Sequence, residues 1–217
     1  MKKLAIFDLD GTLLNTITDL GNACNYALKT MGFATHTIMA YKNMVGNGVR
    51  NLMEKAQPEA DVITIDKLLE YFREYYDEHC TDKTQVYPGI PSLIDELLEK
   101  NVAIAVASNK YQEATEKIIR HFFPQVDFVA IEGSMAGRPR KPDPSVIFDI
   151  LLKAKVRKSE VLFIGDSAND IEAARRACVE SIGVTWGFRP PSELRRAHAN
   201  YIVTHPSQIL DRLNDEF

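Results

Sequence analysis

The sequence predicts an α/β fold in which a doubly wound parallel sheet carries an inserted domain made only of helices. Three observations lead to this fold class. Short apolar runs rich in β-branched residues recur along the chain, segments with helical spacing separate them, and one long stretch near the N-terminus keeps helical spacing throughout. Strands that alternate with helices form βαβ units, and such units build parallel sheets.

Six apolar runs are expected to be strands, at residues 4–7, 102–107, 128–131, 161–164, 181–184 and 201–203. Several are apolar at nearly every position, which is typical of strands covered on both faces. The segments 91–100 and 143–153 each place four apolar residues on one helical face, and we expect helices there. These residues are Leu93, Ile94, Leu97 and Leu98 in the first segment, and Val146, Ile147, Ile150 and Leu151 in the second.

The stretch 15–83 breaks this alternation. Its apolar stripes are Leu20, Ala23, Cys24, Ala27, Leu28 and Met31, and then Leu68, Leu69, Phe72, Tyr75, Tyr76 and His79. Between them, "MVGNGVRNLMEKA" reads as a glycine-containing loop that leads into a third, short helix. We therefore expect two domains: a discontinuous α/β core of residues 1–14 and 84–217, and a helical domain of residues 15–83. The hinges are expected near 14–18 and 84–88.

Composition limits the function classes. The chain of 217 residues is long enough to bury a core, and its formal net charge of −4 argues against nucleic acid or an anionic membrane as the partner. An anionic substrate would need local cations or a metal. The three cysteines are widely spaced, and the N-terminus has neither a signal peptide nor a membrane span, so we expect a cytoplasmic protein with reduced thiols.

Polar side chains follow several predicted strands, at the carboxyl ends where open parallel sheets bind ligands. They are Asp8 and Asp10 after the first run, Ser108 and Asn109 after the second, Asp166 and Asp170 after the fourth, and Lys141 between prolines in "RPRKPDP". Each also has a purely structural interpretation, as a turn residue or as the cap of a following helix. Turns and caps do not explain why carboxylates recur at one edge of the sheet.

The chemistry of a metal-assisted phosphate site does explain the set. Asp8 and Asp10 are two residues apart, so in extended chain their side chains point to the same side. Together with Asp166 they offer an all-oxygen site that suits Mg²⁺. The metal would supply the positive charge that two carboxylates at a strand end require, and Lys141 and the Ser108 hydroxyl are candidate clamps on a phosphoryl group.

The order of these motifs resembles the haloacid dehalogenase superfamily. "DLDGT" is similar to its first motif, "ASN" to its second, the lysine of "RKPDP" to its third and "GDSAND" to its fourth. A helical insert directly after the first motif resembles the C1 cap of one subclass. The resemblance implies a Rossmann-like catalytic core with a helical cap domain.

The resemblance also implies a role for each matching residue. Asp8 would be the nucleophile that forms an aspartyl-phosphate, and Asp10 would give and take the proton. Mg²⁺ would be held by Asp8, Asp166 and the backbone carbonyl of Asp10, with Asp170 orienting the metal shell. Ser108 and Lys141 would bind the transferring phosphoryl group, supported by Thr12 and Asn109.

Within the superfamily, the segment "VGNGVRNLMEKA" of the helical stretch and the late stretch "GVTWGF" are similar to the corresponding segments of phosphoglycolate phosphatases. Gly46, Asn47 and Gly48 could bring backbone amides to a small carboxylate, although Gly48 could equally do no more than open a helix. Arg50 is a candidate carboxylate clamp that matches no position of the family. Cys178 departs from the pattern, because such proteins usually carry glycine there.

The expected function is a Mg²⁺-dependent phosphatase for a small phosphorylated metabolite, with 2-phosphoglycolate as the first substrate to test. The alternatives are a β-phosphoglucomutase-like isomerase with the same nucleophile, a pyrophosphatase of the superfamily, and a phospho-receiver signalling domain. Receivers place the phospho-acceptor after the third strand, where this chain has Glu132. The sequence predicts no nucleic-acid or membrane partner and does not indicate an oligomeric state.

Overall fold

The computed structural model describes residues 1–213, and its main feature is a six-stranded sheet in the order β5-β4-β1-β6-β7-β8. The strands are β1 (Leu4–Phe7), β4 (Ala103–Tyr111), β5 (Ala130–Ser134), β6 (Val161–Gly165), β7 (Glu180–Val184) and β8 (Tyr201–Val203). Every pairing in this sheet is parallel. The predicted fold class is confirmed, and each predicted run lies in or overlaps one of these strands.

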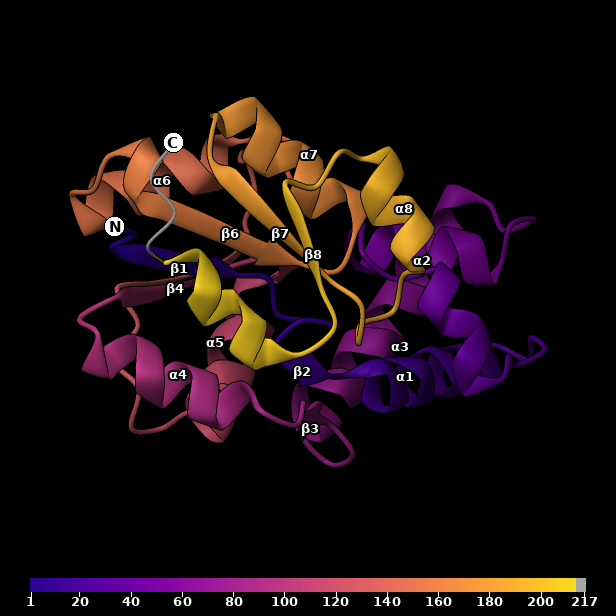
Figure 1. The fold of residues 1–217 in the computed structure, drawn as a ribbon. Helices are drawn as coiled ribbons and strands as arrows, with labels where there is room; N and C mark the ends of the chain where they lie inside the picture. The colour runs from indigo at the N-terminus through magenta and orange to yellow at the C-terminus, as the bar shows by residue number, and fades with distance from the viewer. Residues whose placement is uncertain (214–217) are drawn as a thin grey trace.

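Helices cover both faces of the sheet (Figure 1). Ala5 and Phe7 of β1 pack into the same cluster as the buried residues of α4 (Ile90–Glu99) and α5 (Gln112–Phe122). Leu4 and Ile6 point to the opposite face, toward α6 (Ser145–Ala154) and α7 (Ala168–Ala177). Strands that are buried on both faces have no polar side, which accounts for the continuous apolar runs.

One residue of the two predicted four-residue apolar faces lies outside the core. Leu93, Ile94 and Leu97 of α4 are buried as expected, but Leu98 is 40% exposed. Four apolar residues span a wider arc than the contact with the sheet, so the one at the edge of the stripe faces solvent. The remaining short elements are η2 (Lys158–Glu160), α8 (Pro191–Arg196) and η3 (Pro206–Arg212).

The stretch after β1 forms a separate helical layer beyond the strand ends (Figure 1). It contains α1 (Ile17–Thr30), η1 (Ile38–Asn43), α2 (Gly48–Ala56) and α3 (Val62–His79). The stripes of α1 and α3 pack against each other, with Leu28, Phe72 and Tyr76 fully buried. We call residues 15–83 the helical insert.

Two short strands mark where the chain enters and leaves the helical insert. β2 (Leu14–Asn15) pairs antiparallel with β3 (Gln85–Val86). Beside them the buried Asp19 accepts hydrogen bonds of 2.7–3.0 Å from the backbone N–H groups of Lys83 and Thr84 and from the Thr84 hydroxyl. The strand pairing and the Asp19 hydrogen bonds thus join the segment that enters the helical layer to the segment that leaves it.

The three cysteines are free, with Cys24 and Cys80 buried and Cys178 exposed. Cys178 ends α7 in the left-handed backbone region, with φ of 57°. That conformation favours glycine, which is also the residue that the family resemblance leads us to expect at this position. Among residues 1–213, no helix combines the length and the apolar character that crossing a membrane requires.

Candidate active site

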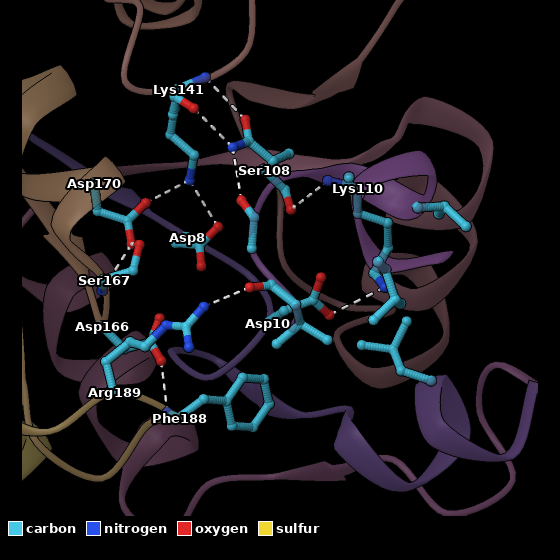
Figure 2. Close-up of a pocket in the computed structure, with 17 residues that line it drawn as sticks. Asp8, Asp10, Ser108, Lys110, Lys141, Asp166, Ser167, Asp170, Phe188 and Arg189 are labelled. Carbon is cyan, nitrogen blue, oxygen red and sulfur yellow. Dashed lines mark hydrogen bonds and ion pairs between the residues drawn. The ribbon is translucent and has the colours of Figure 1, made fainter. Parts of the chain in front are cut away.

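The carboxyl ends of the central strands open into a pocket that the helical insert covers (Figure 2). From the core it is lined by Asp8, Asp10, Ser108, Asn109, Lys110, Lys141, Asp166, Ser167, Asp170, Phe188 and Arg189, and from the insert by Leu20, Val45, Gly46, Gly48, Val49 and Leu52. The enclosed space is about 50 Å³. That volume holds on the order of four water molecules, so the closed pocket suits a small ligand.

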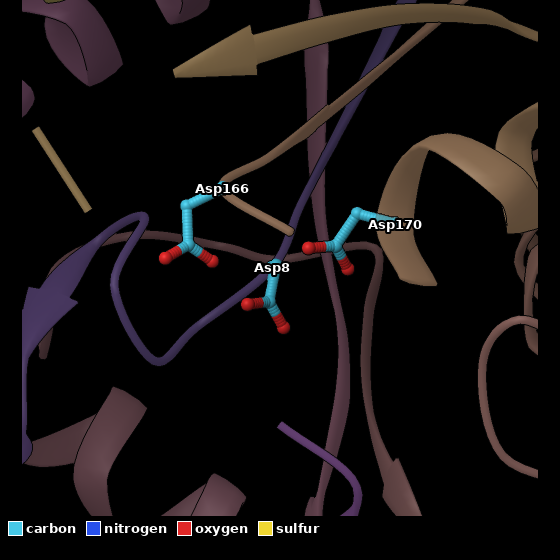
Figure 3. A group of neighbouring side chains, drawn as sticks. All are labelled: Asp8, Asp166 and Asp170. Carbon is cyan, nitrogen blue, oxygen red and sulfur yellow. The ribbon is translucent and has the colours of Figure 1, made fainter. Parts of the chain in front are cut away.

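Three buried carboxylates meet at this edge of the sheet (Figure 3). Asp8 follows β1, Asp166 follows the neighbouring β6, and Asp170 lies in the first turn of α7. One oxygen from each lies within 4.8 Å of the others. The parallel pairing of β1 with β6 brings the first two together, and the capping contacts between Asp170 and Ser167 add the third.

Lys141 neutralises part of this cluster. Its Nζ donates to Asp8 Oδ1 at 2.8 Å, to Asp170 Oδ1 at 2.7 Å and to the Ala107 carbonyl at 2.6 Å, which uses all three hydrogens of the ammonium. Asn109 fixes the lysine backbone, because its side chain donates to the Lys141 carbonyl and accepts from the Lys141 N–H, both at 2.9 Å. The lysine is therefore held from both ends.

The Asp166 carboxylate is also held in place by close contacts with the backbone. The Phe188 N–H donates to its Oδ2 at 2.6 Å. Gly11, with φ of 89°, passes so close that a Cβ at this position would collide with the Asp166 carboxylate. Glycine is therefore required here both for the turn after the first motif and for the close approach.

Burial makes the charges of this cluster costly. It raises the pKa of Asp8 to about 7, and Asp170 and Asp10 raise it too, against the opposing effect of Lys141. Burial, with help from Asp170 and Asp8, raises the pKa of Asp166 well above its usual range. Three carboxylates with one bonded lysine leave a deficit of positive charge, and an all-oxygen donor set fits a divalent cation such as Mg²⁺.

Asp10 lines the same pocket but is not part of the three-carboxylate cluster. Its Oδ1 accepts from the Thr16 hydroxyl at 2.6 Å and lies 3.1 Å from Lys110 Nζ. Figure 2 shows its carboxylate turned toward Lys110. Asp8 and Asp10 both line the pocket, but the chain between them is not extended, because the strand ends at Phe7 and a turn begins at Leu9. The carboxylates that meet are those of Asp8, Asp166 and Asp170.

Ser108 and Thr12 differ in their relation to the pocket. Ser108 lines it from within β4, and its hydroxyl accepts from the Lys110 N–H at 3.2 Å; α5 begins only at Gln112, without a side-chain cap. Thr12 is fully buried and is not among the lining residues. Its carbonyl accepts from the Trp186 indole at 3.0 Å, while its hydroxyl has no hydrogen-bond partner within residues 1–213.

The loop of the insert over the pocket is bonded to the core. Gly46 and Gly48 line the pocket, and Asn109 donates to the Gly46 carbonyl at 2.9 Å. Asn47 is not a lining residue; its side chain accepts from Asn169 at 2.7 Å. Gly48 also begins α2, as one of the two interpretations expected; contact of its amide with a carboxylate stays a prediction. Arg50 forms an exposed ion pair with Asp66 and does not line the pocket.

Two cations of the pocket were missed by the sequence analysis. Lys110 follows "ASN" directly and is buried beneath the insert, where it contacts Asp10 and the Tyr76 hydroxyl. Arg189 follows "GVTWGF" and donates to the Lys42 and Val45 carbonyls at 2.8 and 2.5 Å. Their position next to recognised motifs is the only sequence signal for either residue.

Comparison with known proteins gives one family. The model of the haloacid dehalogenase-like hydrolases matches residues 5–184. A phosphoglycolate phosphatase of Psychrobacter arcticus is 30% identical over 220 residues, covering 98% of this chain and 96% of the relative. A phosphoglycolate phosphatase of Agrobacterium fabrum is 35% identical over 195 residues, covering 87% of this chain and 82% of the relative.

Solved structures agree in fold over the whole chain. A crystal structure from Lactobacillus delbrueckii subsp. bulgaricus has a TM-score of 0.89 at 34% identity and covers 100% of both chains. A protein of Haemophilus somnus, described as a predicted phosphoglycolate phosphatase, has a TM-score of 0.90 at 27% identity and covers 97% of both chains. The helical insert and the sheet are therefore both shared with known structures.

Proposed function

This chain belongs to the haloacid dehalogenase-like hydrolase family and is a phosphatase of that family, and from that premise we propose that it hydrolyses a small phosphate monoester through an aspartyl-phosphate on Asp8. The first substrate we propose is 2-phosphoglycolate, on which its curated relatives are named to act. The observation that carries the proposal is the buried Asp8 carboxylate at the tip of β1, facing a small closed pocket.

Asp8 is placed to attack. Lys141 holds its Oδ1, whereas Oδ2 has no hydrogen-bond partner in the part of the chain that the structure describes, residues 1–213. A carboxylate that is fixed by one oxygen presents the other in a defined direction, which favours attack on a phosphorus atom held in line. Lys141, Ser108 and Asn109 would surround the transferring phosphoryl group.

Asp10 is placed to handle the proton. Thr16 and Lys110 both contact its Oδ1, and within residues 1–213 its Oδ2 has no partner. We assign that oxygen to protonate the leaving alkoxide and then to accept a proton from the attacking water. The separation of Asp10 from the three-carboxylate cluster supports this division of labour, because a carboxylate that does not ligate metal remains free to exchange protons.

Mg²⁺ would be held by Asp8 and Asp166, with Asp170 next to the metal and bonded to Lys141. When bound, the ion would supply the positive charge that the buried carboxylates and an incoming phosphoryl group both need. In this scheme residues 1–14 and 84–217 are the catalytic core, and residues 15–83 are a cap that excludes bulk water and limits the size of the leaving group.

The test is a phosphate-release assay on 2-phosphoglycolate, β-glucose 1-phosphate and pyrophosphate, with Mg²⁺ and after chelation. We expect Mg²⁺-dependent release from 2-phosphoglycolate that Asp8→Asn abolishes, and full activity in the matched control Asp95→Asn, an exposed aspartate on α4. Conversion of β-glucose 1-phosphate to glucose 6-phosphate without phosphate release would favour the isomerase instead. Turnover by Asp8→Asn would refute the nucleophile assignment.

A further inference from the structure

Three cations line the pocket, and two of them are committed to other protein groups. All three hydrogens of the Lys141 ammonium are used by Asp8, Asp170 and the Ala107 carbonyl. The Arg189 guanidinium donates to two backbone carbonyls of the helical insert, those of Lys42 and Val45. Turning either side chain toward the leaving group would break bonds that hold the site or its cover together.

Lys110 is the lining cation beside Asp10, and its ammonium has a hydrogen to spare. Its side chain is 3% exposed, and its Nζ lies 3.1 Å from Asp10 Oδ1 and donates to the Tyr76 hydroxyl at 2.8 Å. An ammonium has three hydrogens; within residues 1–213 it donates one hydrogen bond, to the Tyr76 hydroxyl, and forms an ion pair with Asp10, so at least one hydrogen is without an acceptor. A buried donor without an acceptor is costly, so this lysine is poised to take a ligand oxygen.

The position of Lys110 relative to the reacting groups indicates which oxygen of a ligand it would bind. In the proposed mechanism the ester oxygen of the leaving group lies beside Asp10, so the rest of the leaving group extends past Asp10 on the side away from Asp8. Lys110 forms an ion pair with Asp10 and lines the same pocket. A carboxylate on the carbon next to the ester oxygen is only two bonds away from that oxygen and falls within reach of the ammonium.

We propose that Lys110 binds this carboxylate and thereby makes the enzyme selective for phosphate esters of small 2-hydroxy acids; the inference rests on the proposed function. The apolar side chains Leu20, Val45, Val49 and Leu52 of the insert also line the pocket, and these side chains offer a longer or polar leaving group no hydrogen bonds. A charge-assisted bond in a dry pocket is the kind of contact that separates a charged substrate from a neutral one of the same size.

Tyr76 acts as the positioning residue for this contact. It lies on α3 of the insert, is fully buried, and contributes the hydroxyl that orients the Lys110 ammonium. The ammonium therefore takes this position only when the insert covers the core. Selection of the substrate and closure of the pocket are in this way linked through one hydrogen bond.

The test compares kcat/KM for 2-phosphoglycolate with kcat/KM for 2-hydroxyethyl phosphate, which has the same chain length and an uncharged end. Removing the lysine also disturbs Asp10, and taking the ratio of the two values cancels that common effect. We expect Lys110→Met to lower the ratio roughly ten- to hundredfold, the worth of one hydrogen bond to a charged group. An unchanged ratio in Lys110→Met overturns the inference.

Two further variants keep the test decisive. Arg189→Met is the matched control: we expect both kcat/KM values to fall together, and a collapse of the ratio in this variant alone would assign the carboxylate to Arg189 instead. Tyr76→Phe keeps the lysine and covers the case in which Lys110→Met fails to fold. Here KM for 2-phosphoglycolate should rise with little change in kcat, while KM for 2-hydroxyethyl phosphate stays the same; equal changes for both esters would count against the inference.

The wild-type enzyme separates this inference from the proposed function. If it hydrolyses neither ester, the proposed function is wrong. If it hydrolyses both with equal kcat/KM, the phosphatase assignment stands and the role of Lys110 is refuted.

Discussion

Replacing Asp170 with asparagine tests the part of the site that a metal would share with Lys141. Asp170 is 1% exposed, and both of its oxygens are engaged. Oδ1 accepts from Lys141 Nζ at 2.7 Å, while Oδ2 accepts from the Ser167 N–H at 3.0 Å and from its hydroxyl at 2.6 Å. An amide has one oxygen, so its NH₂ group must face a donor on one of the two sides.

The magnitude follows from what is lost and what is relieved. A hydrogen bond to a charged group contributes about 1.5–3 kcal/mol. Part of that loss is offset, because removing the Asp170 charge relieves its repulsion of the Asp8 and Asp166 carboxylates, whose pKa values it raises. We therefore expect the free energy of unfolding of the metal-free protein to fall by no more than about 2 kcal/mol. A group that orients metal ligands changes metal affinity roughly 10–100-fold, which is about 1.4–2.7 kcal/mol.

The assay is thermal unfolding over a Mg²⁺ titration, because an ion that binds only the folded state raises Tm with its concentration. Wild type should rise in Tm, and Asp170→Asn should need roughly 10–100 times more Mg²⁺ for the same rise. Glu172→Gln is the control, since this residue lies on the same helix and, within residues 1–213, pairs only with Arg175 and Arg176. Wild-type Mg²⁺ affinity in Asp170→Asn would refute the reasoning, as would a wild-type Tm that Mg²⁺ does not change.

Two further predictions concern stability away from the pocket. Glu132 is buried on β5 and accepts from Arg138 at 2.7 Å and Lys153 at 2.5 Å; burial alone would raise its pKa, but the two cations bring it below the usual 4.5. The stabilisation by the ionised Glu132 is therefore complete above pH 4.5 and is lost as the pH falls through the folded-state pKa. Glu132→Gln should lower the free energy of unfolding by about 1–3 kcal/mol at pH 7. In urea unfolding measured over a series of pH values, the variant should also lose less stability in acid than wild type. Equal loss of stability in acid for both proteins would contradict this. Cys178→Gly relieves the left-handed backbone at φ of 57° and should raise the free energy of unfolding by about 0.5–1 kcal/mol without changing turnover; a lower Tm would contradict it.

Most of the sheet could be predicted because its strands are buried on both faces and have no polar side to confuse the pattern. The two-residue strands β2 and β3 could not, since two residues carry no periodicity. β4 extends to Tyr111, past the apolar run, so Ser108 and Asn109 lie inside a strand and do not follow it. Polar residues at the carboxyl end of a strand do not extend an apolar pattern, and here the pairing with β5 is irregular between Ala107 and Tyr111.

Asp8 and Asp166 could be predicted because they follow strands directly, and Asp170 and Lys141 because they lie in motifs next to predicted strands and helices. The direction of the Asp10 carboxylate could not, because it depends on a turn and on contacts with Thr16 and Lys110. Lys110 and Arg189 acquire their places from the helical insert, through Tyr76 in one case and the Val45 carbonyl in the other. Contacts between segments so far apart in the chain leave no trace in residue spacing.

The most direct test of the proposed chemistry is to trap the intermediate. The enzyme is mixed with 2-phosphoglycolate and Mg²⁺, quenched in acid within the first turnover, and digested for peptide mass spectrometry. We expect the mass of one phosphoryl group on the peptide that contains Asp8, and its absence in Asp8→Asn. Release of phosphate by the wild type with no phosphorylated peptide, together with turnover by Asp8→Asn, would contradict the assignment of Asp8 as the nucleophile.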